Sequence, residues 1–76
     1  MNEQLQQLIA KILLIDLEEI SPALQRDDVE DWDSMTHLVL VSDIEHEFGV
    51  SFSDEEVVEI SSVADIVALL SAKGVN

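Results

Sequence analysis

The stretch DSMTHLVLVSDIEHEFG, residues 33–49, decides the fold. Its apolar side chains recur three or four positions apart, which predicts an amphipathic helix with one buried face. Either Asp33 or Ser34 can cap the N-terminus of this helix with a side-chain oxygen, and Gly49 is a natural residue just past its C-terminus. We expect the buried face to consist of Leu38, Leu40, Val41, Ile44 and Phe48.

Three further amphipathic segments flank this helix, and no period-two strand pattern persists. The first covers about residues 2–15. A short helix begins at a capping box in residues 53–56, and the last begins at a similar box in residues 62–65 and stops at residues 73–74. The apolar residues of the three segments are Leu5, Leu8, Ile9, Ile12 and Leu13; Val57, Val58 and Ile60; and Ile66, Val67, Leu69 and Leu70.

A long connection, residues 16–33, links the first two helices and contains Pro22 and many acids. Its own apolar residues predict that it packs against the helices, and loops of this length in compact domains are often functional. These residues are Leu17, Ile20, Leu24, Val29 and Trp32. The predicted fold is an all-α four-helix bundle with three longer helices, a short third helix and a long first loop, formed as one domain by residues 1–76.

Acidic residues dominate the charge: 17 acids face 3 basic residues, for a net charge of −14. Such a chain repels nucleic acid and anionic membranes and favours partners with basic surfaces. Residues 27–59 hold 12 of the acids and no lysine or arginine. A coat that serves only solubility usually mixes both signs, so this distribution favours a recognition surface, with a solvated coat as the alternative.

Other features of the sequence bear on location and chemistry. No apolar run approaches the roughly 20 residues of a membrane span. Residues 1–7 are polar and carry no positive side chain, unlike a signal peptide, so we expect a cytoplasmic protein without membrane insertion. The chain has no cysteine, and any thiol chemistry must therefore come from an attached group.

The motif Asp33-Ser34-Met35 lies where the acidic loop enters the central helix. A serine at a helix N-terminus is exposed, and its hydroxyl lies at the positive end of the helix dipole, where a phosphate is well tolerated. A phosphodiester on Ser34 would therefore be favourably placed. An ordinary N-cap is the alternative role of this serine.

At this point the chain resembles the acyl carrier protein family, from about Leu5 to Leu70. Members share an Asp-Ser-Leu-type tripeptide, an apolar helix, a Glu-x-x-Phe-Gly end, an acidic short helix and a Thr/Ser-Val-type start to the last helix. The matching elements here are Asp33-Ser34-Met35, residues 38–44, Glu45-His46-Glu47-Phe48-Gly49, Asp54-Glu55-Glu56 and Ser61-Ser62-Val63.

The resemblance implies that a phosphopantetheinyl transferase attaches 4′-phosphopantetheine covalently to Ser34. The thiol of the arm would then hold an acyl or aminoacyl group as a thioester, and the chain would have no catalytic residues of its own. Implied partners are an acyl- or adenylate-forming ligase and downstream biosynthetic enzymes with basic docking surfaces. We expect a monomer.

The resemblance also implies which residues meet partners. Asp33 would contact the transferase in addition to any capping role. The exposed side of the central helix would dock partner enzymes, and the expected partner-binding set is Asp33, Met35, Val39, Ser42, Glu45 and Glu55. Val39 departs from the family, because many fatty-acid carriers have glutamate there and often an acid at the position of Thr36. Partners that read this face by apolar contact are therefore expected.

Trp32 gives the variant Asp31-Trp32-Asp33-Ser34-Met35, which is similar to free-standing carriers of specialised pathways, D-alanyl carriers among them. A loop anchor is its structural role. Seven inward residues form either a pocket for an acyl chain or a plain core, and the sequence leaves both open. They are Leu40, Ile44, Phe48, Ile60, Val63, Ile66 and Leu70.

Other groups of residues in the sequence do not make a hydrolase, metal or calcium site. Ser34 and His37 are three apart on one helix, but a hydrolase also needs an oxyanion hole and a cleft. His37 and His46 lack a third metal ligand, and we expect both to be solvated. The acids of residues 27–33 lack the glycine and final glutamate of a calcium loop. No metal site is expected. The remaining alternative to a carrier is an unmodified acidic binding module with the same bundle.

Overall fold

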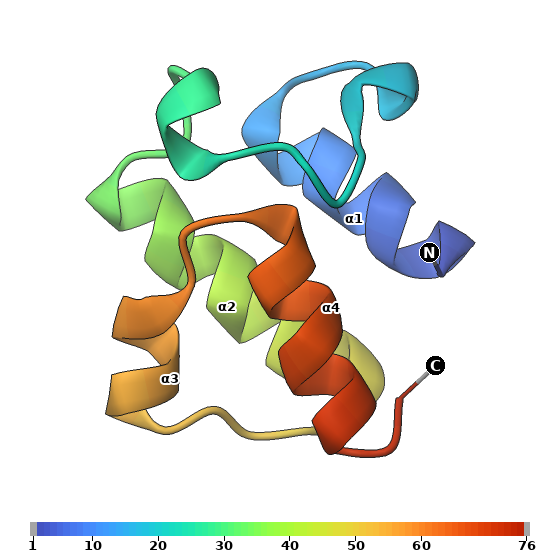
Figure 1. Ribbon diagram of the computed structural model, residues 1–76, viewed down its shortest axis with the longest axis vertical. Helices are drawn as coiled ribbons and strands as arrows, with labels where there is room; N and C mark the ends of the chain where they lie inside the picture. The colour runs from blue at the N-terminus through green and yellow to red at the C-terminus, as the bar shows by residue number, and fades with distance from the viewer. Residues whose placement is uncertain (1, 76) are drawn as a thin grey trace.

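The computed structural model describes residues 2–75 and confirms the all-α bundle with a short third helix (Figure 1). Residues 1 and 76, which the single-domain prediction includes, lie outside the described residues. The elements are α1 (Glu3–Leu13), the 3₁₀ turns η1 (Leu17–Glu19) and η2 (Arg26–Asp28), α2 (Ser34–Phe48), α3 (Asp54–Glu59) and α4 (Val63–Ala72). No helix within residues 2–75 is long and apolar enough to cross a bilayer.

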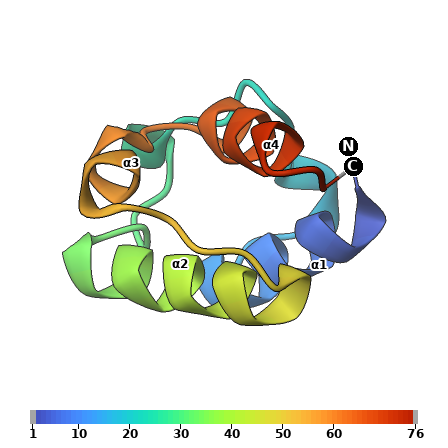
Figure 2. The ribbon, with the colours of Figure 1, turned by 90° about the horizontal axis from the view of Figure 1, so that it is seen from below.

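Figure 2 shows the four helices from below: α2 lies opposite α4, and α1 and α3 lie at the two sides. The buried apolar side chains of these elements form one core cluster. α3 lies beside the first turns of α2. Burial of apolar area supplies most of the favourable free energy of folding. The largest fully buried side chains are Leu5, Ile9, Leu13, Leu40, Ile44, Ile60, Val63 and Ile66.

α1 forms because the predicted apolar stripe faces this core. Leu5, Ile9 and Leu13 are buried, whereas Leu8 and Ile12 are half-buried. The side chain of Asn2 caps the helix by accepting a hydrogen bond from the Leu5 amide at 3.2 Å. The helix ends two residues earlier than predicted, because Leu14 adopts a left-handed conformation with φ of 57°.

α2 is bounded as predicted, with Asp33 as its N-cap and Gly49 as its C-cap. Its buried face differs from the prediction at two residues: Leu38 is 62% exposed, and Phe48 is half-buried. Each residue advances about 100° around an α-helix, so residue 37, four positions before Val41, lies on the same buried face as Val41. Leu38 is rotated away from that face. His37 therefore takes the buried place that the prediction gave to Leu38.

The long connection is packed down as predicted and is also tied to the segment between α3 and α4. Ile20, Val29 and Trp32 are buried, whereas Leu17, predicted to pack inward, is 43% exposed. The backbone bonds are Arg26 N to Ser61 O at 2.8 Å, Val63 N to Leu24 O at 3.0 Å and Ala64 N to Pro22 O at 3.1 Å. These bonds fix the path by which the chain reaches Ser34.

Side chains cap the N-termini of both α3 and α4. Ser53 and Glu56 form the predicted capping box at α3. Ser62 caps α4 by accepting from the Asp65 amide at 3.2 Å. The second predicted box is incomplete, because the Asp65 carboxylate accepts instead from the amide and hydroxyl of Ser61.

Candidate functional site

Ser34 is the first residue of α2, and its side chain is exposed. Among residues 2–75 the structure shows no hydrogen bond from its hydroxyl to another residue. The cap is Asp33, whose Oδ1 accepts from the Thr36 amide at 2.8 Å. The serine is thus not needed as the cap, and its oxygen stands at the positive end of the helix dipole.

Asp33 is held in its ionised form by the helix it caps. The Thr36 amide, and then the Thr36 hydroxyl, lower the pKa of this exposed carboxyl below its ordinary value, and the charge of Arg26 adds to the effect. A carboxylate therefore stands beside Ser34 at neutral pH. Its capping role is observed, and its contact with a transferase stays a prediction.

The segment that leads into Ser34 is anchored by Trp32, which is 3% exposed. Its carbonyl accepts from Arg26 Nε at 3.2 Å, and its Nε1–H donates to His37 Nδ1 at 2.9 Å. His37 Nε2 lies 2.8 Å from the Val57 carbonyl oxygen of α3. The loop-anchor role of Trp32 is confirmed.

The prediction that His37 is solvated was wrong, since only 5% of its surface is exposed. Its two ring nitrogens find partners inside the bundle, which removes the cost of burying them. The sequence contained a signal for this arrangement. A buried indole N–H needs an acceptor, and His37 lies one helical turn after Asp33, the residue that follows Trp32. His46 is exposed as predicted.

The exposed side of α2 carries the predicted docking residues together with one that the sequence missed. Met35 is 77% exposed, and Val39 and Ser42 are also exposed. Leu38 joins them, and Val58 of the neighbouring α3 is 80% exposed. Met35, Leu38 and Val39 thus give α2 an exposed apolar surface close to Ser34, and α3 carries an exposed valine of its own.

The two predicted glutamates differ in their surroundings. Glu45 is half-buried, and its Oε2 accepts from the Phe52 amide at 2.7 Å, so it braces the connection between α2 and α3. Glu55 is exposed in the first turn of α3. It lines a shallow depression of about 330 Å³ with Asp54, Val58 and Glu59.

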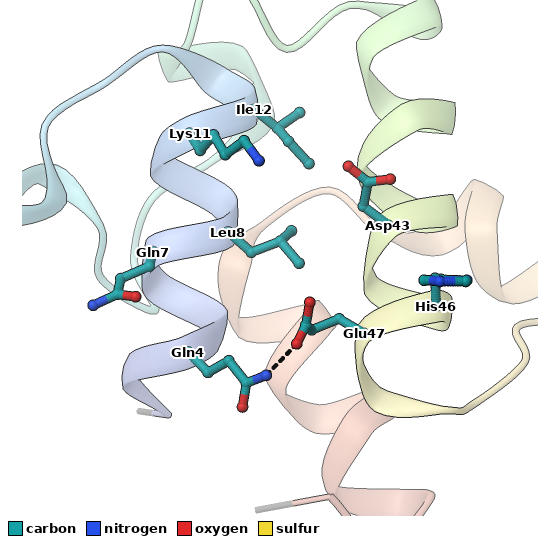
Figure 3. A pocket seen from close by; sticks show the side chains of 8 residues that line it. All are labelled: Gln4, Gln7, Leu8, Lys11, Ile12, Asp43, His46 and Glu47. Atoms are coloured by element: carbon teal, nitrogen blue, oxygen red, sulfur yellow. Dashed lines mark hydrogen bonds between the residues drawn. The ribbon is translucent and has the colours of Figure 1, made fainter.

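A larger surface pocket of about 350 Å³ lies between α1 and α2 (Figure 3). Leu8 and Ile12 form its apolar floor on the α1 side, and Asp43 and Glu47 face them from α2. Gln4 Nε2 donates to the Glu47 carboxylate across its mouth. None of the predicted site residues lines this pocket.

The seven residues that the sequence assigned to an acyl pocket or a core lie in the packed core. All belong to one cluster, in which Phe48 alone of the seven is partly buried. The pockets between α1 and α2, at α3, and beside η2 are lined by other residues. They pack as core in this structure, and an acyl pocket among them stays a prediction.

The arrangement at Ser34 fits a phosphopantetheine group. Ser34 is exposed to solvent in the structure, and the N-terminus of a helix stabilises a phosphodiester. Arg26, which acts on Asp33, supplies a positive charge that offsets the neighbouring carboxylate. A thiol-bearing arm would also extend into solvent without displacing core side chains.

Comparison with known proteins agrees with this geometry. A family model described as a phosphopantetheine attachment site matches residues 3–70. An acyl carrier protein of Petrotoga mobilis is 35% identical over 71 residues, covering 93% of this chain and 84% of the relative. One of Solidesulfovibrio magneticus is 31% identical over 71 residues, covering 93% and 91%. The chain therefore belongs to the acyl carrier protein family, whose members are carriers rather than catalysts and bear a 4′-phosphopantetheine group.

Proposed function

We propose that Ser34 bears the 4′-phosphopantetheine arm and that the chain presents an acyl or aminoacyl thioester to partner enzymes of a specialised biosynthetic pathway. The observation that carries this proposal is the exposed Ser34 hydroxyl at the head of α2, left without a capping task by Asp33. Cytoplasmic location and a monomeric state belong to the same proposal.

The modification itself is a phosphoryl transfer. The Ser34 oxygen forms a bond to the phosphorus nearest the pantetheine of coenzyme A, the diphosphate bond breaks, and the nucleotide leaves with the electron pair. The serine proton passes to a base of the transferase, which also supplies Mg²⁺ and positioning. This chain contributes the hydroxyl and the helix dipole. Once attached, the arm supplies the thiol that holds the cargo.

The docking surface follows from the exposed residues around Ser34. Met35, Leu38 and Val39 provide its apolar centre, which an adaptable methionine suits to several partners. Asp33 and Glu55 provide an acidic rim on α2 and α3. A partner with an apolar patch surrounded by basic side chains complements this surface, since opposite charges steer association. Ser42 and Glu45 extend it along α2.

The proposal of a specialised pathway rests on two residues. Val39 offers an apolar contact where many fatty-acid carriers offer a carboxylate, and Trp32 precedes the attachment motif. A D-alanyl or aminoacyl carrier is the alternative subtype, because the exposed surface fits either class of partner.

Intact mass spectrometry tests the attachment site. Folded wild-type protein incubated with coenzyme A and a broad-specificity transferase should gain the mass of one phosphopantetheinyl group. Ser34→Ala should gain none while keeping the helical circular dichroism spectrum, because Asp33 still caps the helix. Ser71→Ala, which changes an exposed serine of α4, should behave as wild type.

Two outcomes would contradict the proposal. A folded wild-type protein whose mass stays unchanged would favour the unmodified acidic binding module. A mass gain that persists in Ser34→Ala would move the attachment to another residue.

A further inference from the structure

His37 is a buried polar side chain that neither the attachment of the arm nor the docking surface uses. It joins three parts of the chain at one point. Trp32, two residues before Ser34, donates to its Nδ1 at 2.9 Å, and the Val57 carbonyl of α3 lies 2.8 Å from its Nε2. His37 itself is on the first turn of α2, three residues after the serine.

The two partners dictate the protonation of the ring. An indole N–H can only donate, so His37 Nδ1 must be the unprotonated acceptor. A carbonyl can only accept, so Nε2 must carry the proton. The neutral ring with its proton on Nε2 satisfies both partners, and the structure shows no buried side-chain nitrogen or oxygen without a partner in residues 2–75.

These bonds join α3 and the segment before Ser34 to the first turn of α2, in addition to the Lys73–Glu56 ion pair on α3 and the burial of Trp32. α3 has no fully buried residue of its own. The segment before Ser34 is held through Trp32, whose carbonyl binds Arg26 and whose indole binds His37. Removal of the imidazole would leave the indole N–H and the Val57 carbonyl without this partner and free both elements to move. α3 lies beside the first turns of α2, and this segment leads directly into Ser34.

We propose that His37 is a positioning residue for the modification of Ser34. Its neutral imidazole holds the segment before the serine and α3 in the one arrangement that the transferase binds. The inference rests on the proposed function of Ser34. If the bonds are lost, only a fraction of the carrier is competent at any time, and the apparent KM rises by the inverse of that fraction while kcat stays unchanged.

Steady-state kinetics of Ser34 modification test this role, with the carrier as the varied substrate. In His37→Phe, which keeps a ring but has no hydrogen-bonding group, KM should rise about three- to tenfold with kcat retained. His37→Gln should restore much of the wild-type KM, because an amide can accept from Trp32 and donate to Val57. His46→Phe, which alters the exposed histidine of the same helix, is the matched control and should behave as wild type.

Trp32 provides a direct readout, because it is the single tryptophan of the sequence. Its indole N–H proton resonance should shift upfield and exchange faster with solvent in His37→Phe than in wild type or His37→Gln. Trp32→Phe removes the donor from the other side and should raise KM in the same way. This second variant decides the question if His37→Phe does not fold.

The outcomes separate the two proposals. A wild-type carrier that is not modified overturns the proposed function and this inference with it. A modified wild type with unchanged KM in folded His37→Phe and in Trp32→Phe overturns the inference alone, even if both variants melt at a lower temperature. A His37→Gln variant as impaired as His37→Phe also overturns it, since hydrogen bonding would then not be what matters.

Discussion

At the residue scale, Asp33 and Ser34 divide two tasks that a single capping serine would have to combine. Asp33 closes the first turn of α2 by accepting from the Thr36 amide. The neighbouring Ser34 hydroxyl is thereby left for covalent chemistry at the end of the dipole. Because the cap is a separate residue, modification of Ser34 leaves the hydrogen bond to the Thr36 amide unchanged.

Substitution of Asp33 separates capping from recognition. Asn caps helices about as well as Asp, whereas Ala does not. We expect Asp33→Asn to keep the urea midpoint measured by circular dichroism but to lower kcat/KM for the transferase. Asp33→Ala should lower both. If Asp33→Asn is modified at the wild-type rate, the carboxylate acts as a cap alone.

The capping carboxylates also predict how stability depends on pH. Hydrogen bonds from Thr36, Ser53 and Ser61 amides lower the pKa values of Asp33, Glu56 and Asp65 from ordinary values of 3.8, 4.5 and 3.8 respectively. A carboxyl whose pKa is lower in the folded state stabilises the fold above its unfolded pKa, and this contribution is lost as the pH falls through the folded pKa.

The melting temperature should therefore be steady from about pH 7 to pH 5 and should fall below about pH 4 as these carboxylates take up protons. Asp65→Asn removes one of the three groups and should show a smaller fall over the same range. Protonation also relieves repulsion among the acids in both proteins, so the comparison between them is the test: an equal fall in wild type and Asp65→Asn would show that this carboxylate contributes little.

Prediction from the sequence succeeded for some individual side chains of α2 and failed for others. Asp33, Ser34 and Gly49 were readable because helix ends need particular side chains or a left-handed residue. The prediction buried Leu38 and exposed His37, which is the reverse of the structure, because hydrophobicity favours burying leucine over histidine. The bonds of His37 to Trp32 and Val57 reverse that preference, and the second of them joins residues 20 positions apart.

At the scale of elements, α1 and α2 end in the same backbone conformation with different residues. Gly49 has φ of 66° and Leu14 has φ of 57°. A left-handed conformation costs an L-residue with a side chain roughly 1–2 kcal/mol, and glycine avoids this cost. Leu14 is 76% exposed, so its side chain gives little packing in return.

We therefore expect Leu14→Gly to stabilise the fold by about 0.5–1 kcal/mol, measured as the free energy of unfolding in urea. Gly49→Ala is the matched reverse change and should destabilise by a similar amount. The space around Gly49 is open, with nothing within 4 Å of an added Cβ, so the effect would be conformational. A Leu14→Gly variant less stable than wild type would contradict this account.

The cap of α4 is coupled to the long loop. Ser62 accepts from the Asp65 amide, and its neighbours Ser61 and Val63 bond to the loop backbone. Ser62→Ala should cost about 1 kcal/mol of unfolding free energy, a usual value for an N-cap. Ser71→Ala, exposed in the same helix, should be neutral within about 0.5 kcal/mol. An equal loss in both variants would argue against a capping role.

These loop contacts show why the helices were predictable and their docking was not. The stripe of α1 and the box of α3 depend on neighbours three or four residues away, which a local pattern contains. The bonds from residues 22–26 to residues 61–64 join distant parts of the chain and depend on backbone groups that every residue carries. No side-chain pattern marks them.

At the scale of the whole molecule, charge is strongly unbalanced. The net charge is −14, and Lys73 with Glu56, at 3.1 Å, is the only ion pair that the structure shows in residues 2–75. Most carboxylates therefore repel one another without local compensation. Such self-repulsion opposes the compact state and at the same time attracts basic partners from a distance.

The same charges should thus give two opposite responses to salt. Screening has a length of about 10 Å at 0.1 M and shortens as salt is added, so repulsion within the bundle weakens and the melting temperature should rise with sodium chloride. Attraction between the carrier and a basic transferase is screened as well, so kcat/KM for Ser34 modification should fall over the same range. Calorimetry and modification kinetics in one salt series measure both.

Asp54→Asn, at the rim of the docking surface, should flatten the kinetic response more than Glu18→Gln, an equally exposed acid on η1, whereas both should ease self-repulsion similarly. If the two variants flatten the kinetic response equally, the carrier attracts its partner through net charge rather than through the acids of the proposed docking surface.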